Sequence, residues 1–322
     1  MTERTALVLG ATGGIGGEVA HRLKASGWAV RALHRQAAQR SGADGFDWRQ
    51  GDAMQRKDVM DAANGVALIV HAVNPPGYRK WNETVLPMLD NTIAAAKASG
   101  ARILLPGTVY NYGPDVFPEP DETSRQNPMT VKGRIRAEME RRLRDAATNE
   151  AKALIVRAGD FFGPRAGNNW FAQGLVKPGR PVSAVTYPGK PGIGHQWAYL
   201  PDVAETMVQL LQREAALEPF ATFHLQGHWD ADGTQMIAAI RRVVGRPELP
   251  VRGFPWRLMT LASPFVPLFR ELKEMRYLWQ VPVRMTNARL IGMLGAEPRT
   301  PLDEAVRATL AGLGCLSEER LQ

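Results

Sequence analysis

The chain has 322 residues, 44% of them hydrophobic and 22% charged, and it carries a formal net charge of +8 at pH 7. These values exclude a mostly disordered chain and predict a globular protein with one dominant domain and a smaller partner. The basic residues are scattered, and the densest cluster, Arg134 to Arg144, is interleaved with Glu138 and Glu140. Because this pattern is typical of a solvated helix face and no readout motif is present, we expect no nucleic-acid partner. The positive charge suits a phosphorylated cofactor.

Cysteine content and apolar runs predict a soluble cytoplasmic protein. Cys315 is the only cysteine, which excludes an intrachain disulfide and a zinc site built from several thiolates, and we expect it to be a packing residue. No metal site is predicted. The longest apolar stretches, 66–73 and 259–269, are too short to cross a bilayer, and the first residues lack the pattern of a signal peptide. We therefore expect neither secretion nor a membrane partner.

The first half of the chain alternates short apolar runs with helical patterns. Continuous apolar runs bounded by turn residues predict strands that are covered on both faces, as in a parallel sheet. Their alternation with helices implies right-handed crossovers, so we predict an α/β fold with a Rossmann-type, doubly wound parallel sheet. The expected strands are Thr5 to Leu9, Trp28 to Leu33, Val66 to Ala72, Arg102 to Leu105 and Ala153 to Arg157, and the expected helices are Glu18 to Ala25, Asn82 to Ser99 and Lys132 to Ala147.

From about residue 161 the regular alternation ends, and turn-forming pairs such as Gly163-Pro164 separate short elements. We assign residues 1–160 to a dinucleotide-binding Rossmann domain and residues 161–322 mainly to a smaller substrate-binding subdomain, with segments that return to the Rossmann core. Pro201 to Arg213 is the clearest helix of this second part. The stretch from Phe254 to Trp279 is rich in aromatic residues, methionine and proline, which suits a pocket wall, a subunit contact or packing against the sheet edge.

A glycine-rich turn follows the first strand and opens the first helix. In this setting each glycine of the G-x-x-G-x-x-G pattern has a mechanical role, since one makes a tight turn, one allows close approach to a pyrophosphate, and one allows close packing of helix on strand. The helix N-terminus adds unpaired N–H groups and a partial positive charge. We therefore expect the whole turn to line the pyrophosphate of a dinucleotide. Its residues are Gly10, Ala11, Thr12, Gly13, Gly14, Ile15 and Gly16.

The end of the second strand indicates which cofactor is bound. An acidic side chain there would bind the ribose 2′-hydroxyl of NAD, but this chain has His34-Arg35 and no acid until Asp44. A guanidinium suits a 2′-phosphate, so Arg35 favours NADP, with NAD as the alternative and a merely solvated arginine as the other interpretation. Asp52 is placed either to contact the adenine edge or to cap a helix. Ala72, Val73 and Asn74, after the fourth strand, are expected to pass the middle of the cofactor.

Several segments share their order with one enzyme family. They are the glycine turn, Gly51-Asp52, the Asn91 helix, Val109 to Gly113, Arg157 to Pro164, and Tyr199 to Ala204. In this order the chain resembles the extended short-chain dehydrogenases/reductases, specifically the NAD-dependent epimerase/dehydratase group, over nearly its whole length. One departure is Leu9, which stands where the family usually has threonine. The resemblance also implies that Phe161 and Phe162 lie on the nicotinamide side. In this family dimers commonly form through two long helices, here 82–99 and 132–147, but the dense charge of the second does not favour a dry hydrophobic interface and leaves the oligomeric state open.

The resemblance implies a catalytic Ser or Thr, a Tyr and a Lys, the last two in Tyr-x-x-x-Lys, where the tyrosine exchanges the proton. Thr108 matches the hydroxyl residue, and Lys132 is the candidate lysine. Four residues before Lys132, however, stands Pro128, and the shifted pair Thr130 and Arg134 has the wrong chemistry. The usual acid/base pair is therefore missing.

Three consequences stay open. Tyr110 or Tyr112 could replace the lost phenol, which would give an oxidoreductase or epimerase with rearranged machinery acting on a small carbonyl, hydroxyl or nucleotide-sugar-like substrate. His195, expected on a loop ahead of the Tyr199 strand, could instead move the proton, although a lone loop histidine is more often an ordinary hydrogen-bonding residue. The third interpretation is a non-catalytic, NADP-binding sensor that passes the state of the cofactor to a partner protein.

Overall fold

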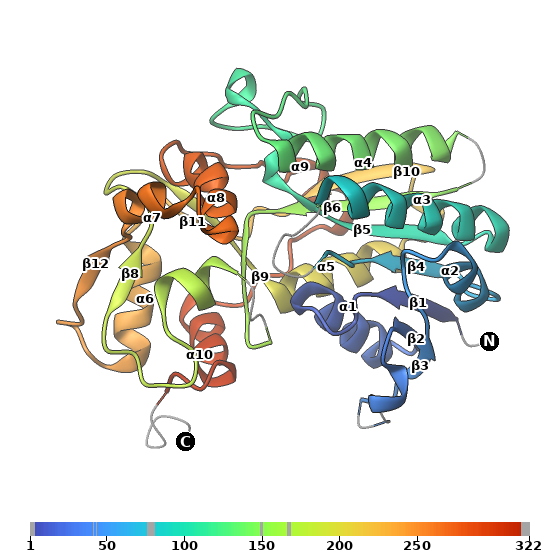
Figure 1. Ribbon diagram of the computed structural model, residues 1–322, viewed down its shortest axis with the longest axis horizontal. Coiled ribbons are helices and arrows are strands. Elements are labelled where there is room, and N and C mark those ends of the chain that lie inside the picture. The colour runs from blue at the N-terminus through green and yellow to red at the C-terminus, as the bar shows by residue number, and fades with distance from the viewer. Residues whose placement is uncertain are drawn as a thin grey trace.

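The computed structural model describes residues 4–40, 42, 44–75, 81–148, 151–165 and 169–316. These residues form a larger unit built on a central sheet and a smaller unit beside it, and the two ends of the chain lie on different units (Figure 1). None of the described helices is long and apolar enough to cross a membrane.

Within the described residues, seven strands form one sheet in the order β10-β6-β5-β4-β1-β2-β3, and every neighbouring pair is parallel. The inner strands are mostly apolar and are buried on both faces, as is typical of a parallel sheet. This arrangement confirms the predicted Rossmann-type sheet. The strands are β1 (Thr5–Leu9), β2 (Ala29–His34), β3 (Asp47–Gln50), β4 (Leu68–His71), β5 (Arg102–Thr108), β6 (Ala153–Ala158) and β10 (Phe220–His224).

Helices cover both faces of the sheet. One face packs against α1 and α5 through an apolar cluster that includes Val19, Leu23 and Met207. The other face packs against α2, α3 and α4 through a cluster that includes Val59, Leu89 and Leu143. Three short 3-10 turns, η1 (Ala37–Gln39), η3 (Val109–Asn111) and η4 (Pro114–Val116), follow β2 and β5. The helices are α1 (Gly14–Ala25), α2 (Arg56–Ala62), α3 (Trp81–Ser99), α4 (Val131–Ala147) and α5 (Leu200–Gln212).

After β6 the chain builds the smaller unit and returns to the larger one more than once. Strands β11, β9 and β7 form one small sheet, and β12 pairs with β8. A third apolar cluster unites this unit around Trp197, Trp279 and helices α6 and α10, and it includes the buried Cys315. Helix α5 and strand β10 belong to the larger unit, and α9 packs against both. The strands are β7 (Asp160–Phe162), β8 (Val185–Tyr187), β9 (His195–Tyr199), β11 (His228–Asp230) and β12 (Val251–Gly253).

The remaining helices lie mainly in the second part of the chain. The segment 254–279, whose role the sequence left open, contains α7, α8 and η7, and its aromatic side chains pack on Trp170. These helical elements are η5 (Phe171–Leu175), η6 (Glu214–Ala216), α6 (Gln235–Val244), α7 (Trp256–Ala262), α8 (Pro267–Glu274), η7 (Met275–Trp279), α9 (Ala288–Leu294) and α10 (Leu302–Gly312).

Candidate cofactor and substrate site

The carboxyl ends of the parallel strands meet at one edge of the sheet. In an open α/β sheet, ligands bind outside this edge where the strand order reverses, which here is between β1 and β4. Gly10 follows β1, Arg35 follows β2, Ala72 follows β4, and Thr108 ends β5. The topology therefore brings to one edge the residues that the sequence predicted for the cofactor, together with the first of the predicted catalytic residues.

The glycine turn is packed so closely that two of its positions exclude a side chain. Gly10 has a φ of +92°, and a Cβ atom placed there would lie 2.6 Å from the carbonyl oxygen of Ala72. A Cβ atom on Gly16 would lie 2.2 Å from the carbonyl oxygen of Gly10. These distances are far below van der Waals contact, so β1, β4 and the start of α1 approach each other only because both residues are glycine.

Gly13 differs from these two glycines. A Cβ atom on Gly13 would meet only the carbonyl oxygen of Gly10, at 3.3 Å, so the fold does not require glycine there as strictly. Gly13 is the N-cap of α1, no side chain caps this helix, and its first turn holds no acidic residue. The N–H groups that begin a helix have no partner within it, and they carry a partial positive charge. An exposed, uncapped helix start fits the diphosphate of a dinucleotide.

Arg35 lies where a 2′-phosphate would need a cation. Its side chain is exposed and makes no hydrogen bond or ion pair to another described residue, while its carbonyl oxygen accepts from Gln50. Burial, Arg40 and Arg35 lower the pKa of the neighbouring His34. The end of β2 is thus a region of positive potential, which suits a phosphate better than a neutral hydroxyl.

Asp52 braces a turn and does not cap α2, whose N-cap is Gln55. Its Oδ1 accepts a hydrogen bond from the Met54 N–H at 3.0 Å, and its own N–H donates to the Asp58 carboxylate at 2.9 Å. The helix-cap interpretation is therefore wrong, whereas the adenine contact stays a prediction.

The segment after β4 is tied to the glycine turn and to α4. The Ala72 N–H donates to the Leu9 carbonyl at 3.0 Å, which continues the ladder between β1 and β4. Val73 is half-buried, and the exposed Asn74 accepts a hydrogen bond from Arg136 of α4 at 3.3 Å. The Arg136 guanidinium in turn lies over the Trp81 ring, 5.3 Å from its centre. These contacts hold the segment beside the path that the sequence assigned to the cofactor.

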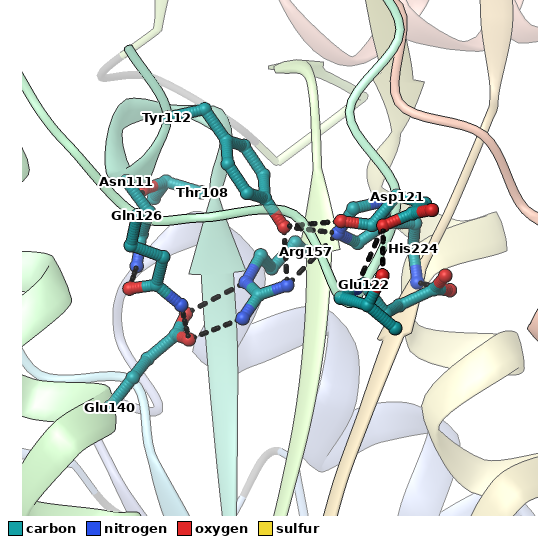
Figure 2. Close-up of polar contacts among 10 residues, drawn as sticks. Thr108, Asn111, Tyr112, Asp121, Glu122, Gln126, Glu140, Arg157 and His224 are labelled. Atoms are coloured by element: carbon teal, nitrogen blue, oxygen red, sulfur yellow. Dashed lines mark hydrogen bonds and ion pairs between the residues drawn. The ribbon is translucent and has the colours of Figure 1, made fainter. Parts of the chain in front are cut away.

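Thr108 begins a chain of hydrogen bonds that leads into the protein (Figure 2). Its hydroxyl donates to the Asn111 side chain at 3.2 Å, Asn111 donates to Gln126 at 3.0 Å, and Gln126 donates to the Glu140 carboxylate at 2.7 Å. Glu140 holds the buried Arg157 of β6 through two hydrogen bonds. The carboxyl ends of β5 and β6 are therefore joined to α4 by polar side chains.

Tyr112 belongs to the same buried network. Its ring is fully buried, and its hydroxyl lies 2.6 Å from Arg157 Nη1, 2.7 Å from His224 Nε2 and 3.1 Å from the Asp121 carbonyl. Burial raises the pKa of this phenol, and the same cause lowers the pKa of His224 to about 3. A phenol with three internal partners and no exposed surface does not face an open site, so Tyr112 is a structural residue and not the replacement base.

Lys132 is also held by an internal partner. It is buried at the first turn of α4, where its Nζ lies 3.2 Å from Glu274 Oε2 and its backbone N–H donates to Glu274 Oε1 at 3.1 Å. Glu274 ends α8, so this ion pair connects the two units. Thr130, one member of the shifted pair, caps α4 by accepting from the Gly133 N–H. Tyr110 is half-buried, and its carbonyl oxygen lies against Gly133.

His195 lies in a strand and not on the predicted loop, because it is the first residue of β9. It is 5% exposed, its Nε2 lies 2.8 Å from the Asp160 carboxylate, and its ring stacks on Trp279 with centres 3.7 Å apart. Asp160 and the half-buried Phe161 follow β6 directly in β7, at the carboxyl edge of the main sheet. The histidine that the sequence singled out is thus paired with a carboxylate and covered by an indole.

The sequence did not predict three parts of this site: the Asp160–His195 pair, the Lys132–Glu274 pair, and the network around Arg157. A buried arginine in a strand otherwise made of apolar residues was the one local signal, because such a charge needs a partner. Among the described residues, no group of three or more His, Cys, Asp and Glu side chains could hold a metal ion.

The sequence pattern of the NAD-dependent epimerase/dehydratase family matches residues 6–225, more than half of the chain. The chain belongs to this family. A comparison with curated protein sequences finds no match.

Solved structures share the fold at low sequence identity. UDP-glucose 4-epimerase from Brucella ovis in complex with NAD has 17% identity and a TM-score of 0.74, over 97% of this chain and 98% of its own. UDP-glucose 4-epimerase from Bifidobacterium longum in complex with NAD+ and UDP has 16% identity and a TM-score of 0.71, over 95% and 97%. MoeE5 in complex with UDP-glucose and NAD has 15% identity and a TM-score of 0.72, over 96% and 98%.

Proposed function

We propose that this family member binds a nicotinamide dinucleotide at the carboxyl edge of its sheet, with NADP preferred over NAD. In this proposal it uses the cofactor for redox or epimerase chemistry on a small carbonyl, hydroxyl or nucleotide-sugar-like substrate. The observation that carries the proposal is the start of α1, where the helix N-terminus has no side-chain cap and the surrounding glycine turn has two positions, Gly10 and Gly16, with no room for a side chain. Membership in the family supports the reaction class.

In this proposal, different residues of the chain bind different parts of the cofactor. The N–H groups at the start of α1 would bind the diphosphate, Arg35 the 2′-phosphate, and the segment from Ala72 to Asn74 would flank the middle of the molecule. When bound, a nicotinamide dinucleotide supplies or accepts a hydride. Thr108, at the end of β5, and Phe161, in β7 just after β6, are the side chains that we place near the substrate.

The Gly13→Val variant tests the proposal. A valine there would occupy the position of the diphosphate, while the nearest atom to its Cβ would be 3.3 Å away, so cofactor binding should be lost and the fold retained. Gly253→Val is the matched control, because Gly253 has open space around it and lies outside the site. Binding is measured by titration calorimetry and the fold by circular dichroism. Retained NADP affinity in a folded Gly13→Val protein would refute the role of the glycine turn.

A second candidate is the non-catalytic sensor. The ion pair between Lys132 and Glu274 favours it, because a lysine held this way is not directed at a nicotinamide ribose. The two functions differ in steady NADPH turnover across a panel of carbonyl compounds and nucleotide sugars. If the protein binds NADP at micromolar concentration but oxidises no NADPH with any member of the panel, the result would favour the sensor. NADPH turnover with any member of the panel would exclude it.

A further inference from the structure

A cavity of about 410 Å³ lies where strand β11 meets the starts of helices α6 and α10. These three elements all belong to the smaller unit (Figure 1). The volume is within the range of pockets that hold small organic molecules. The residues that line the cavity include none of those assigned to the cofactor, and neither Thr108 nor Lys132. The cavity is therefore separate from the edge of the main sheet.

The inner end of the cavity carries two nitrogen atoms without a partner. Trp197 of β9 and His228 of β11 are cross-strand partners, so their side chains lie on the same face of the small sheet. Both line the cavity together with Met236 of α6 and Leu302 of α10. Trp197 is fully buried and His228 is 4% exposed, yet Trp197 Nε1 and His228 Nε2 have no hydrogen-bond partner among the described residues. Because buried polar groups are nearly always paired, these two nitrogens indicate a missing ligand atom.

The outer end of the cavity carries an unused positive charge. The Arg299 side chain is exposed and makes no hydrogen bond or ion pair to another described residue. Two carboxylates are near it, but both are occupied. Asp230 accepts three backbone N–H groups at the start of α6, and Asp202 accepts the N–H and the hydroxyl of Thr300. Burial raises the pKa of the Asp202 carboxyl, and the Arg299 charge opposes this rise. The guanidinium is thus available to an anion that enters the cavity.

The charges around the cavity favour a carboxylate over a phosphate. Burial and then Arg299 lower the pKa of His228 to about 4, so this imidazole is neutral at pH 7 and adds no second cation. The Asp230 carboxylate also lines the cavity. It repels a doubly charged phosphate more strongly than a singly charged carboxylate. One guanidinium therefore matches one carboxylate.

Between the two ends the lining is mostly apolar and includes the side chains of Trp229, Met236, Pro301 and Leu302. Such walls suit a flat ring. At the inner end the indole of Trp197 can only donate a hydrogen bond, whereas a neutral imidazole nitrogen either donates or accepts. A hydroxyl group fits both, because its oxygen accepts from the indole while it donates to or accepts from the imidazole.

We propose that this cavity is a second binding site, for a small aromatic carboxylate that carries a hydroxyl group on the opposite side of its ring. The carboxylate pairs with Arg299, the ring packs on Trp229, and the hydroxyl meets Trp197 and His228. The site shares no residue with the edge of the main sheet. Its ligand therefore binds without the cofactor, and the inference does not depend on the proposed function.

The probe for this site is para-hydroxybenzoate, and its binding to the full chain without cofactor is measured by titration calorimetry. We expect one binding site per chain. Arg299→Gln should weaken binding by about tenfold or more, the lower end for loss of a hydrogen bond to a charged group. Arg307→Gln should keep the wild-type affinity. It is the matched control, because Arg307 is exposed on α10 and does not line the cavity.

His228→Phe tests the inner end of the cavity. Because His228 Nε2 has no described partner, a ring of similar size should leave the fold intact, which circular dichroism checks. The wild-type chain should bind para-hydroxybenzoate more tightly than benzoate, which lacks the hydroxyl. His228→Phe should reduce this preference by about threefold or more, as expected for one neutral hydrogen bond.

Any of four results would overturn the inference. They are no saturable binding of para-hydroxybenzoate at millimolar concentration, equal affinity in Arg299→Gln and the wild type, an unchanged preference over benzoate in His228→Phe, and loss of probe binding in Gly13→Val. The last result would place the probe at the cofactor edge. Probe binding with the expected variant effects in a chain that binds no NADP would support this inference and overturn the proposed function alone.

Discussion

Replacing Glu140 by glutamine should reveal how much the buried network contributes to stability. Arg157 is 1% exposed, and Glu140 accepts two of its hydrogen bonds, so Glu140→Gln leaves a guanidinium in the core without its counter-charge. Breaking a buried ion pair by removing one partner costs about 3–5 kcal/mol. Because whole domains are stable by about 5–15 kcal/mol, this one change should remove a large part of the free energy of unfolding.

Urea unfolding followed by circular dichroism measures this loss as a lower midpoint at an unchanged slope. Glu138→Gln is the matched control, because Glu138 lies on the same helix and is also paired with arginines, Arg141 and Arg142, but it is 29% exposed. An exposed pair of this kind contributes at most about 1 kcal/mol. Equal losses in the two variants would show that burial of the Arg157 charge does not determine the cost.

Two further predictions concern the cofactor and pH. Arg35→Ala should weaken NADP binding by about 1.5–3 kcal/mol, which is the range for a hydrogen bond to a charged group, and should leave NAD binding nearly unchanged. If titration calorimetry shows that NADP and NAD lose the same binding free energy, Arg35 does not recognise the 2′-phosphate. Burial and then Arg136 lower the pKa of His71 to about 3, so between that pH and 6.5 the unfolded chain holds a proton that the folded chain lacks. Stability should therefore fall on acidification below pH 6.5, by about 1.4 kcal/mol per pH unit for this group. His71→Gln should reduce the slope of stability against pH by that amount in urea titrations from pH 6.5 to 4. An unchanged slope would contradict the lowered pKa of His71 in the folded protein.

The features that sequence predicted well are those made by neighbouring residues. The glycine turn, the buried strands and the long helices each depend on a local pattern, and their bounds in the structure differ from the expected ones by a few residues at most. The third predicted helix, for example, was expected from Lys132 and begins at Val131. His195 was misplaced because Gly192 and Gly194 before it suggested a loop, whereas pairing with β7 and β11 extends the strand.

The parts of the site that sequence did not predict are made by residues far apart in the chain. Lys132 and Glu274 are 142 positions apart, and Asp160 and His195 are 35 apart, so no spacing rule connects them. Tyr110 and Tyr112 look equivalent as phenols in a sequence. Only the structure shows that the Tyr112 hydroxyl is buried and has three hydrogen-bond partners inside the protein.

The return of α5 and β10 to the larger unit limits how the two units can be separated. A chain cut after residue 160 would leave β6 as an exposed edge strand and would strip the cover from the face that α1 shares with α5. The smaller unit therefore cannot be exchanged between relatives as a single continuous cassette. Because the chain crosses between the units more than once, any movement of one unit relative to the other has to bend every crossing segment together.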